Sequence, residues 1–283
     1  MVIFKKVVDI QSFILQNRAA GRTVAFIPTM GALHSGHTAL VAAAKRDGHM
    51  TVASIFVNPT QFNDKADFQK YPTSVDADIA MLTAIGCDVL FLPPVDEVYP
   101  QGTDSMPVYE FGYLDTVLEG ARRPGHFKGV GQVVARLLDI VKPDKLYMGQ
   151  KDYQQCMVVR SLLQQTGSHA DMIINPTVRE ADGLAMSSRN RRLTEPQRAL
   201  AGIIYQCLVS IQAKGQQGGD FKIVQKECED LLTDKGFRPE YIALADADTL
   251  ELLDNYDNNR KTVALIAAWL GDIRLIDNMP VNG

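Results

Sequence analysis

The chain has 283 residues, of which 46% are hydrophobic and 22% are charged. This composition excludes wholesale disorder, and the length fits one large domain or a large domain with a small one. The formal net charge of -4 counts against a protein that coats nucleic acid, so no nucleic-acid partner is expected.

The sequence also bears on membranes and on the redox environment. No apolar run approaches the ~20 residues of a membrane-spanning helix, and the N-terminal residues lack the apolar core of a signal peptide. The four cysteines form no C-x-x-C pair, and a chain of this size needs no disulfide bonds. We therefore expect a cytoplasmic protein with free thiols and no membrane partner.

Up to about residue 175, strand-like apolar runs alternate with helical stretches. Apolar strands covered on both faces predict an α/β fold with a doubly wound, Rossmann-like parallel sheet. Ligands of such sheets bind beyond the carboxyl ends of the strands, so each segment that follows a strand is a candidate site. We expect strands over 23–27, 50–57, 88–92, 146–148 and 172–174, and helices over 9–20, 36–47, 74–85, 129–141 and 153–165.

After Pro176 the pattern changes, and we place a domain boundary there, between residues 1–176 and residues 177–283. The second part begins with a polar stretch that contains four arginines, and a Gly271-Asp272 pair further on is typical of a hairpin. We predict a smaller α+β C-terminal domain with helices over 195–214 and 221–235 and strands over 241–245, 262–269 and 273–276.

Two glycines and two histidines follow the first predicted strand, in the run Pro28-Thr29-Met30-Gly31-Ala32-Leu33-His34-Ser35-Gly36-His37. Glycine lets the backbone approach a ligand closely, and the start of the next helix suits phosphate. Both histidines could donate to that ligand, or the segment could be a capped turn with two surface histidines. The chain has no P-loop, and we interpret Gly129 and Gly131 as close packing at a helix start.

Polar residues also follow the second strand. Gln61 could bind a hydroxyl group and a carboxylate, or it could stabilise a proline turn. Asp76 and Asp78 come next, two residues apart on a predicted helix, so they do not share a face. At most one of them should serve a given site, and solvated acids on a helix surface are the alternative.

Two later segments suit anions. Gly149-Gln150-Lys151-Asp152 ends the fourth strand and Gln155 lies one helical turn further, which indicates a site for an anion or a capped helix with exposed polar residues. The run Ala185-Met186-Ser187-Ser188-Arg189-Asn190 places small hydroxyls beside a guanidinium, a good phosphate contact or a basic surface loop.

Together these segments resemble the nucleotidyltransferase superfamily that includes class I aminoacyl-tRNA synthetases. His34-Ser35-Gly36-His37 is similar to its H-I-G-H motif, and Ala185-Met186-Ser187-Ser188-Arg189 is similar to its K-M-S-K-S loop, with Ala185 at the first lysine. Within it, the chain most resembles the pantothenate synthetase (pantoate–β-alanine ligase) family, in four motifs that occur in order: P-T-M-G-A-L-H-x-G-H, I-F-V-N-P-x-Q-F, G-x-K-D-Y-Q-Q and V-R-E-x-D-G-L-A-M-S-S-R-N.

The resemblance implies a two-step reaction with ATP and Mg²⁺. Pantoate attacks the α-phosphate of ATP to form pantoyl adenylate, and β-alanine then displaces AMP to give pantothenate. It also implies a nucleotide- and pantoate-binding domain over 1–176, a C-terminal lid domain over 177–283, and a homodimer. Gln150 stands where many relatives carry an acidic residue before the Lys-Asp pair.

The resemblance further implies the role of each candidate residue. His37, His34, Lys151 and Arg189 are the expected catalytic residues and also bind the phosphates. Gln61 and Gln155 are expected to bind pantoate, with Gln61 also near β-alanine, and Asp78 to lie on the magnesium side, usually through water. The other ATP-site residues are Met30, Gly31, Gly149, Asp152, Val178, Met186, Ser187 and Ser188.

Two other functions are weighed against this one. A related adenylyltransferase would share the H-x-G-H motif but leave AMP on its product. A noncatalytic nucleotide-binding module would bind ATP without turnover. The glutamines at 61 and 155 favour a small hydroxy acid as substrate, and free AMP as a product would separate the ligase from both alternatives.

Overall fold

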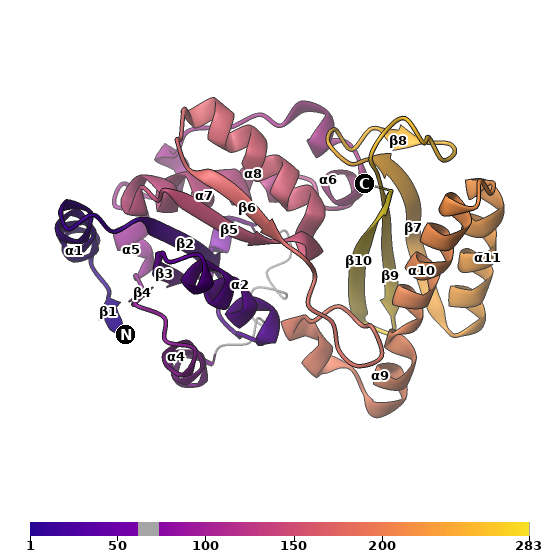
Figure 1. Ribbon diagram of the computed structural model, residues 1–283, viewed down its shortest axis with the longest axis horizontal. Helices are drawn as coiled ribbons and strands as arrows, with labels where there is room; N and C mark the ends of the chain where they lie inside the picture. The colour runs from indigo at the N-terminus through magenta and orange to yellow at the C-terminus, as the bar shows by residue number, and fades with distance from the viewer. Residues whose placement is uncertain (62–73, 283) are drawn as a thin grey trace. The chain divides into compact units, whose positions relative to one another are not determined.

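The computed structural model describes residues 1–61 and 74–282, and the chain divides into two compact units (Figure 1). Unit 1 comprises Met1–Gly149 and Gln154–Pro176. Unit 2 comprises Gln150–Tyr153 and the chain from Thr177 onward. The chain therefore enters unit 2 briefly after residue 149 and again after residue 176. Phe62, the last residue of the second motif, lies outside the described residues.

Unit 1 contains a six-stranded sheet in the order β1-β4-β3-β2-β5-β6, with every pair parallel. The predicted α/β fold is confirmed, with one strand more than predicted. The extra strand, β1, is three residues long and pairs with β4, too short to give a sequence pattern. The strands are β1 (Val2–Phe4), β2 (Val24–Thr29), β3 (Met50–Ile55), β4 (Val89–Phe91), β5 (Lys145–Gly149) and β6 (Asp171–Asn175).

Both faces of the central part of this sheet are covered, which explains why β2, β3 and β4 are buried and mostly apolar. On β2, Ala25 and Ile27 join a buried cluster with residues of α2 and α4. The alternating residues Val24 and Phe26 project to the other face, and α7 packs against β2. The helices are α1 (Val7–Ala19), α2 (Ser35–Arg46), α4 (Val75–Ala84), α5 (Val95–Val98), α6 (Leu118–Arg122), α7 (His126–Val141) and α8 (Tyr153–Thr166).

Helix boundaries differ from the predictions in unit 1. Helix α1 begins at Val7, two residues before the predicted start at residue 9, and its N-cap residue Lys6 makes no side-chain capping hydrogen bond. Helix α7 begins at His126, which places Gly129 in its first turn. A Cβ on Gly129 would lie 2.5 Å from the Thr60 carbonyl oxygen, which confirms the interpretation of close packing. Short 3₁₀ turns complete the unit at η1 (Pro59–Gln61), η2 (Thr103–Ser105) and η3 (Gly112–Asp115).

Unit 2 pairs an antiparallel sheet with two long helices, as predicted for an α+β domain. Its strands follow the order β10-β9-β7-β8, and α10 and α11 pack against it around a buried apolar cluster. The hairpin turn at Gly271-Asp272 joins β9 to β10 as expected. The elements are η4 (Gln150–Asp152), η5 (Ser188–Arg192), α9 (Glu195–Ala201), α10 (Ile203–Gln216), α11 (Phe221–Asp234), β7 (Phe237–Asp246), β8 (Leu252–Leu253), β9 (Thr262–Leu270) and β10 (Ile273–Asn282).

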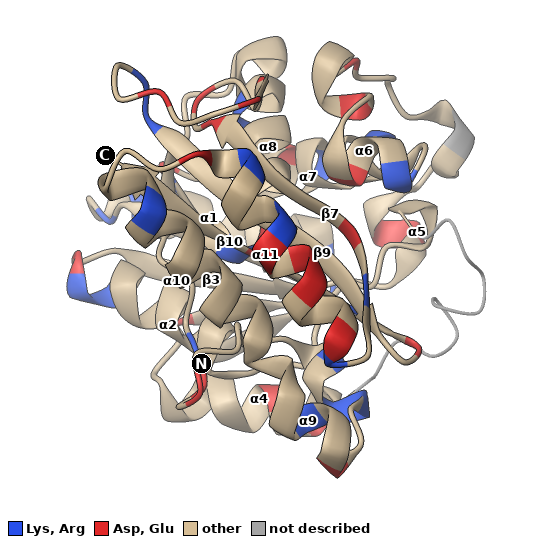
Figure 2. Cartoon of the chain, turned by 90° about the vertical axis from the view of Figure 1, so that its right-hand side faces the viewer, with Lys and Arg blue, Asp and Glu red and all other residues tan. Residues whose placement is uncertain are grey.

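The single helix predicted over 195–214 is two helices, α9 and α10, which meet at Gly202. A Cβ at Gly202 would lie 2.9 Å from the Asp182 carbonyl oxygen, so the break lets another segment approach closely. Figure 2 shows residues of both charges on α11, where Lys226 Nζ lies 2.7 Å from Asp230 Oδ1. Over the residues that the structure describes, none of the helices has both the length and the apolar character needed to cross a bilayer.

Candidate active site

The loop between β2 and α2 lies where the sheet order changes direction. From β2 the chain passes to β3 and β4 on one side, while β5 and β6 lie on the other. Parallel sheets bind ligands at such a switch point, beyond the carboxyl ends of the strands. Met30, Gly31, His34 and His37 follow β2 there, and Gly149 ends the neighbouring β5. Among the residues that the structure describes, a Cβ built on Gly149 would meet nothing within 4 Å apart from its chain neighbours.

The two histidines form the N-terminal cap of α2. His34 is the N-cap residue, and its Nδ1 accepts a hydrogen bond from the Gly36 N–H at 3.1 Å. His37 Nδ1 accepts from the His34 N–H at 3.3 Å, and the two rings lie 4.1 Å apart. A neutral ring that accepts at Nδ1 carries its hydrogen on Nε2, so each Nε2–H is assigned as a donor. The structure contains the capped turn, and the binding of a ligand by the two histidines stays a prediction.

The side chain of Asp78 binds the backbone of the β2–α2 loop. This side chain is 1% exposed, and its carboxylate accepts hydrogen bonds from the N–H groups of Ala32 at 2.9 Å and Leu33 at 2.8 Å. The Ser74 hydroxyl donates to the same carboxylate at 3.0 Å. Gly31 and Ala32 have positive φ values of 79° and 49°. The turn that they form directs the N–H groups of Ala32 and Leu33 at one anion, the Asp78 carboxylate.

Asp76, two residues earlier, is exposed on the other side of α4, as the helical spacing predicted. Holding Ala32 at positive φ costs about 1–2 kcal/mol for a residue with a Cβ. The hydrogen bonds to Asp78 offset that cost, so the carboxylate fixes the conformation of the loop that carries His34 and His37.

Gln61 lies at the end of η1, after β3, and is 8% exposed. Its amide nitrogen donates to Met30 Sδ at 2.7 Å, so the structure brings these two predicted residues together. Its amide oxygen accepts from Asn58 Nδ2 at 3.4 Å. Asn58 in turn donates to the Gly129 carbonyl at 3.2 Å, which ties the segment to α7.

Asn58, Tyr99 and His126 support Gln61 and were not selected from the sequence. The Tyr99 hydroxyl donates to Asn58 Oδ1 at 2.9 Å, and burial raises the pKa of Tyr99 to about 12, so the phenol stays protonated. Arg123 donates to His126 Nε2 at 3.1 Å, so His126 carries its hydrogen on Nδ1 and donates to the Gln61 carbonyl at 2.9 Å. For Asn58 alone the sequence held a signal, since it lies in the N-P-x-Q motif.

The adjacent glutamines on α8 have different environments. Gln154 is 3% exposed; its amide accepts from the Glu119 N–H at 2.9 Å and donates to the carbonyls of Leu114 and Val117 at 2.7 and 3.0 Å. Gln155 is half-buried, and its amide has no hydrogen-bond partner among residues 1–61 and 74–282. Gln154 therefore stabilises the fold, while the amide of Gln155 is available for a ligand.

In unit 2, Lys151 lies in the η4 turn, with 19% of its side chain exposed. Its Nζ lies 3.3 Å from Asp152 Oδ1. The main-chain carbonyls of Gln150 and Lys151 both accept hydrogen bonds from Asn278 Nδ2, at 3.0 and 2.9 Å. The turn that carries the lysine is thus fixed by β10.

The segment before Arg189 is a small hairpin. The Met186 N–H donates to the Val178 carbonyl at 3.0 Å, which brings two predicted residues together, and Arg179 bridges to Ala185. Gly183 closes the turn with a φ of 88°, and a Cβ there would clash with the Tyr205 ring. Arg198 pairs with Asp182 and lowers the pKa of that carboxyl. Beyond the hairpin, the Ser187 hydroxyl caps η5 by accepting from the Arg189 N–H at 3.3 Å.

The predicted site residues thus form two groups, one in each unit. Unit 1 carries Met30, Gly31, His34, His37, Gln61, Asp78, Gly149 and Gln155. Unit 2 carries Lys151, Asp152, Val178, Met186, Ser187, Ser188 and Arg189. Near the second group, Thr177 Oγ1 and Asn190 Oδ1 are buried without a hydrogen-bond partner among the described residues.

The residues offer little for a protein-held metal ion. Across the described parts of the chain, no group of three His, Cys, Asp or Glu side chains is arranged as a metal site. The carboxylate of Asp78 is buried and accepts three hydrogen bonds, so it does not present a ligand set for Mg²⁺. These observations do not fit direct coordination by Asp78.

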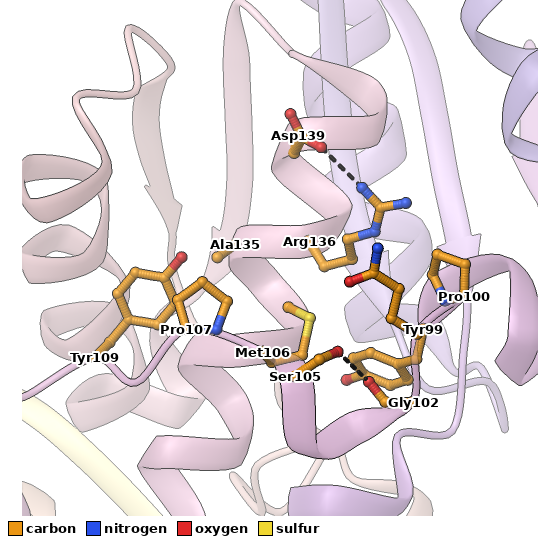
Figure 3. A pocket seen from close by; sticks show the side chains of 11 residues that line it. Tyr99, Pro100, Gly102, Ser105, Met106, Pro107, Tyr109, Ala135, Arg136 and Asp139 are labelled. Carbon is orange, nitrogen blue, oxygen red and sulfur yellow. Dashed lines mark hydrogen bonds and ion pairs between the residues drawn. The ribbon is translucent and has the colours of Figure 1, made fainter.

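A cavity of about 400 Å³ lies elsewhere in unit 1, between α7 and the segment that follows α5 (Figure 3). Within it, Arg136 Nη1 lies 2.8 Å from Asp139 Oδ2, and Arg136 Nε donates to the Val98 carbonyl at 2.9 Å. This charge is already paired, and no predicted site residue lines the cavity. Its lining residues are Tyr99, Pro100, Gln101, Gly102, Ser105, Met106, Pro107, Tyr109, Ala135, Arg136 and Asp139.

Comparison with known proteins decides the family. A family model described as pantoate-beta-alanine ligase matches residues 2–280. The chain belongs to the pantoate–β-alanine ligase family. A pantothenate synthetase of Bacteroides thetaiotaomicron is 42% identical over 284 residues, which cover 99% of this chain and 98% of that protein. A pantothenate synthetase of Porphyromonas gingivalis is 40% identical over 279 residues, with 99% of both chains covered.

Solved structures of pantoate–β-alanine ligases have the same fold. A pantothenate synthetase from Thermus thermophilus matches with a TM-score of 0.92 and 39% identity, covering 100% of both chains. A pantoate–β-alanine ligase from Francisella tularensis, complexed with β,γ ATP and β-alanine, matches with a TM-score of 0.82 and 34% identity over 99% of this chain and 98% of that one. The resemblance inferred from the four motifs is confirmed.

Proposed function

We propose that this chain joins pantoate to β-alanine in two steps, with pantoyl adenylate as the intermediate. Family membership makes the chain an ATP-dependent pantoate–β-alanine ligase. A carboxylate is a poor acyl donor, and linking it to AMP as a mixed anhydride supplies a good leaving group. The observation that carries the proposal is the fixed β2–α2 loop, which presents two imidazole N–H donors at the switch point of the sheet.

In the first step, the pantoate carboxylate attacks the α-phosphorus of ATP and pyrophosphate leaves. Negative charge builds up on the phosphate oxygens, and preorganised donors stabilise it. We assign this role to the Nε2–H groups of His34 and His37, with His37 the foremost donor, and to the cations of Lys151 and Arg189. The hydroxyls of Ser187 and Ser188 and the backbone beside Gly31 and Gly149 complete the nucleotide contacts.

In the second step, the amine of β-alanine attacks the acyl carbon and AMP leaves. The attacking amine must first lose a proton, because an ammonium group has no lone pair. We assign Gln61 and Gln155 to pantoate, whose hydroxyl and carboxylate an amide can bind by donating and accepting. The remaining nucleotide contacts fall to Met30, Asp152, Val178 and Met186. Holding both substrates in one site can contribute roughly 7–11 kcal/mol.

Magnesium enters this proposal with the nucleotide. Mg²⁺ retains several water ligands and usually binds through substrate phosphates, where it neutralises charge. Because the Asp78 carboxylate accepts hydrogen bonds from Ala32, Leu33 and Ser74, we assign it to the loop and assign no protein ligand to the ion.

Exchange of labelled pyrophosphate into ATP tests the first step. With magnesium and pantoate present and β-alanine absent, we expect exchange that depends on pantoate, because adenylate formation is reversible. Replacing pantoate with a close analogue that lacks its hydroxyl group is the control. Absence of exchange in protein that still binds ATP would contradict the proposed intermediate. Release of free AMP once β-alanine is added separates the ligase from an adenylyltransferase.

The neighbouring glutamines provide a matched pair of variants. We expect Gln155→Ala to raise the KM for pantoate about 10-fold, because each lost hydrogen bond is worth about 0.5–1.5 kcal/mol, and to leave thermal stability unchanged. We expect Gln154→Ala to lower the melting temperature, because three buried hydrogen bonds are lost. Steady-state kinetics and thermal unfolding of both variants measure this. Equal effects on KM would contradict the assignment of Gln155.

The cellular setting and the assembly of the enzyme are part of the proposal. The thiols of Cys87, Cys156, Cys207 and Cys228 are free and buried, which supports a reducing, cytoplasmic location. A homodimer is part of this proposal, and sedimentation of the purified protein would test that state. Closure of the C-terminal unit as a lid would exclude water from the adenylate.

A further inference from the structure

Strand β10 lies at one edge of the unit 2 sheet, and two site segments contact this strand. It pairs with β9 on one side, and among the described residues no strand pairs with its other side. Both η4, which carries Lys151, and η5, which carries Arg189, contact β10. Two polar residues in the middle of this strand, Asp277 and Asn278, are buried, at 4% and 2% exposure.

Asn278 binds the η4 turn through three hydrogen bonds. Its Nδ2 donates to the carbonyls of Gln150 at 3.0 Å and Lys151 at 2.9 Å, and its Oδ1 accepts from Gln150 Nε2 at 3.1 Å. Two consecutive carbonyls are therefore fixed by one side chain. This contact sets the position of the Lys151 backbone and, through it, where the ammonium group can reach.

Asp277 binds the hairpin that leads to Arg189. The Arg179 guanidinium donates to both carboxylate oxygens of Asp277, at 2.5 and 3.1 Å, in a two-pronged ion pair. The same guanidinium donates to the Gly183 carbonyl at 2.9 Å and lies 4.4 Å from the centre of the Tyr205 ring. The base and the turn of the hairpin are thus held to one carboxylate.

We propose that Asp277 and Asn278 are positioning residues that fix Lys151 and the Ser187–Arg189 segment relative to each other. Neighbouring residues on a strand project to opposite faces, so one rigid dipeptide holds two segments that lie far apart in the sequence. The inference rests on the proposed function, because it assumes that Lys151 and Arg189 act at the phosphates. It assigns β10 a part in adenylation.

Asn278→Ala and Asn282→Ala are a matched pair that tests this inference. Both asparagines lie on β10 and make three hydrogen bonds, but those of Asn282 go to Thr262 and Asp257, away from the site segments. We expect N278A to lower the kcat of pantoate-dependent pyrophosphate exchange by roughly 10- to 100-fold, since small misplacements have effects of that size. We expect N282A to lower thermal stability to a similar extent and to leave the exchange rate near the wild-type value.

A double-mutant cycle with Lys151 distinguishes positioning from a general loss of structure. If Asn278 acts through Lys151, the double variant N278A/K151A exchanges pyrophosphate at nearly the same rate as K151A. Any small further loss comes from Arg189. Independent effects that multiply would overturn the inference. So would a normal N278A enzyme beside a slow K151A enzyme.

Failure of the proposed function gives a different pattern. Normal exchange by K151A itself would overturn the role of Lys151, and with it the premise of the inference. If N278A does not fold, Asn278→Asp takes its place in every arm, because the isosteric carboxylate cannot donate to the two carbonyls. A wild-type exchange rate in folded N278D would then overturn the inference.

Discussion

Replacing Lys151 by alanine is expected to slow pantoate-dependent pyrophosphate exchange by roughly 10²- to 10³-fold, the loss typical of removing one preorganised donor at a developing negative charge. Lys151 lies in a turn whose position is fixed, because two of its carbonyls accept hydrogen bonds from Asn278. Water that replaces the Lys151 side chain would not provide a charge held at the same place. The affinity for ATP should fall less than the rate, because the charge matters most as the transition state forms.

Single-turnover formation of pantoyl adenylate measures this loss directly. Lys145→Ala is the matched control, because its ammonium group is also paired, 2.7 Å from Asp171 Oδ2, and Lys145 begins β5, the strand that precedes the η4 turn of Lys151. Removing that exposed ion pair should leave both thermal stability and adenylation almost unchanged, because solvent screens the charges. Adenylate formation at the normal rate in K151A would contradict the assignment.

Replacing Asp78 by asparagine is expected to abolish most activity and also to destabilise unit 1. An amide has one acceptor oxygen and turns an NH₂ group toward the N–H groups of Ala32 and Leu33. At least one buried N–H then loses its acceptor, which costs roughly 1–3 kcal/mol. The positive-φ turn loses its anion, so the cap formed by His34 and His37 should become disordered and the KM for ATP should rise more than 10-fold.

Asp76→Asn is the control for this variant, since Asp76 is exposed on the same helix, two residues away. A magnesium titration of the residual activity distinguishes the two roles weighed for Asp78. A carboxylate that fixes the loop predicts an unchanged dependence on magnesium, whereas a magnesium ligand predicts a large rise in the concentration required. The second result would restore the metal role and contradict the loop assignment.

Local sequence patterns were sufficient for five of the six strands of the sheet, and they also select the segments to which we assign the chemistry. The apolar runs within β2 to β6 identify strands because burial on both faces leaves few polar positions in a parallel sheet. The rule that ligands bind beyond the carboxyl ends of strands then selects His34, Gln61 and Gly149 without knowledge of their contacts.

Contacts between segments that are distant in the sequence could not be predicted from such local patterns. Asp78 and Asp76 have the same local chemistry, and only the tertiary structure buries the first under the β2–α2 loop. Gln154 and Gln155 are adjacent and identical in type, yet one is a buried structural amide. Asp277 and Asn278 are more than 80 residues from the segments they bind, and nothing in their own neighbourhood in the sequence marks them.

The helix break at Gly202 has a related cause. The apolar periodicity continues from α9 into α10, so the pattern predicts one helix. The break follows from the close approach of Asp182, whose carbonyl oxygen would lie 2.9 Å from any Cβ at that position.

The edge of β10 also bears on the solubility of the enzyme. A strand of ten residues with one unpaired edge is a template for pairing with another chain, and Pro280 interrupts only its far end. The η4 and η5 segments contact this strand, and we expect them to hinder such pairing while they are docked. Variants that release these two segments would therefore aggregate, and less soluble enzyme would be recovered. The activity of a lysate should then be expressed per amount of soluble enzyme before a loss is ascribed to a slower reaction.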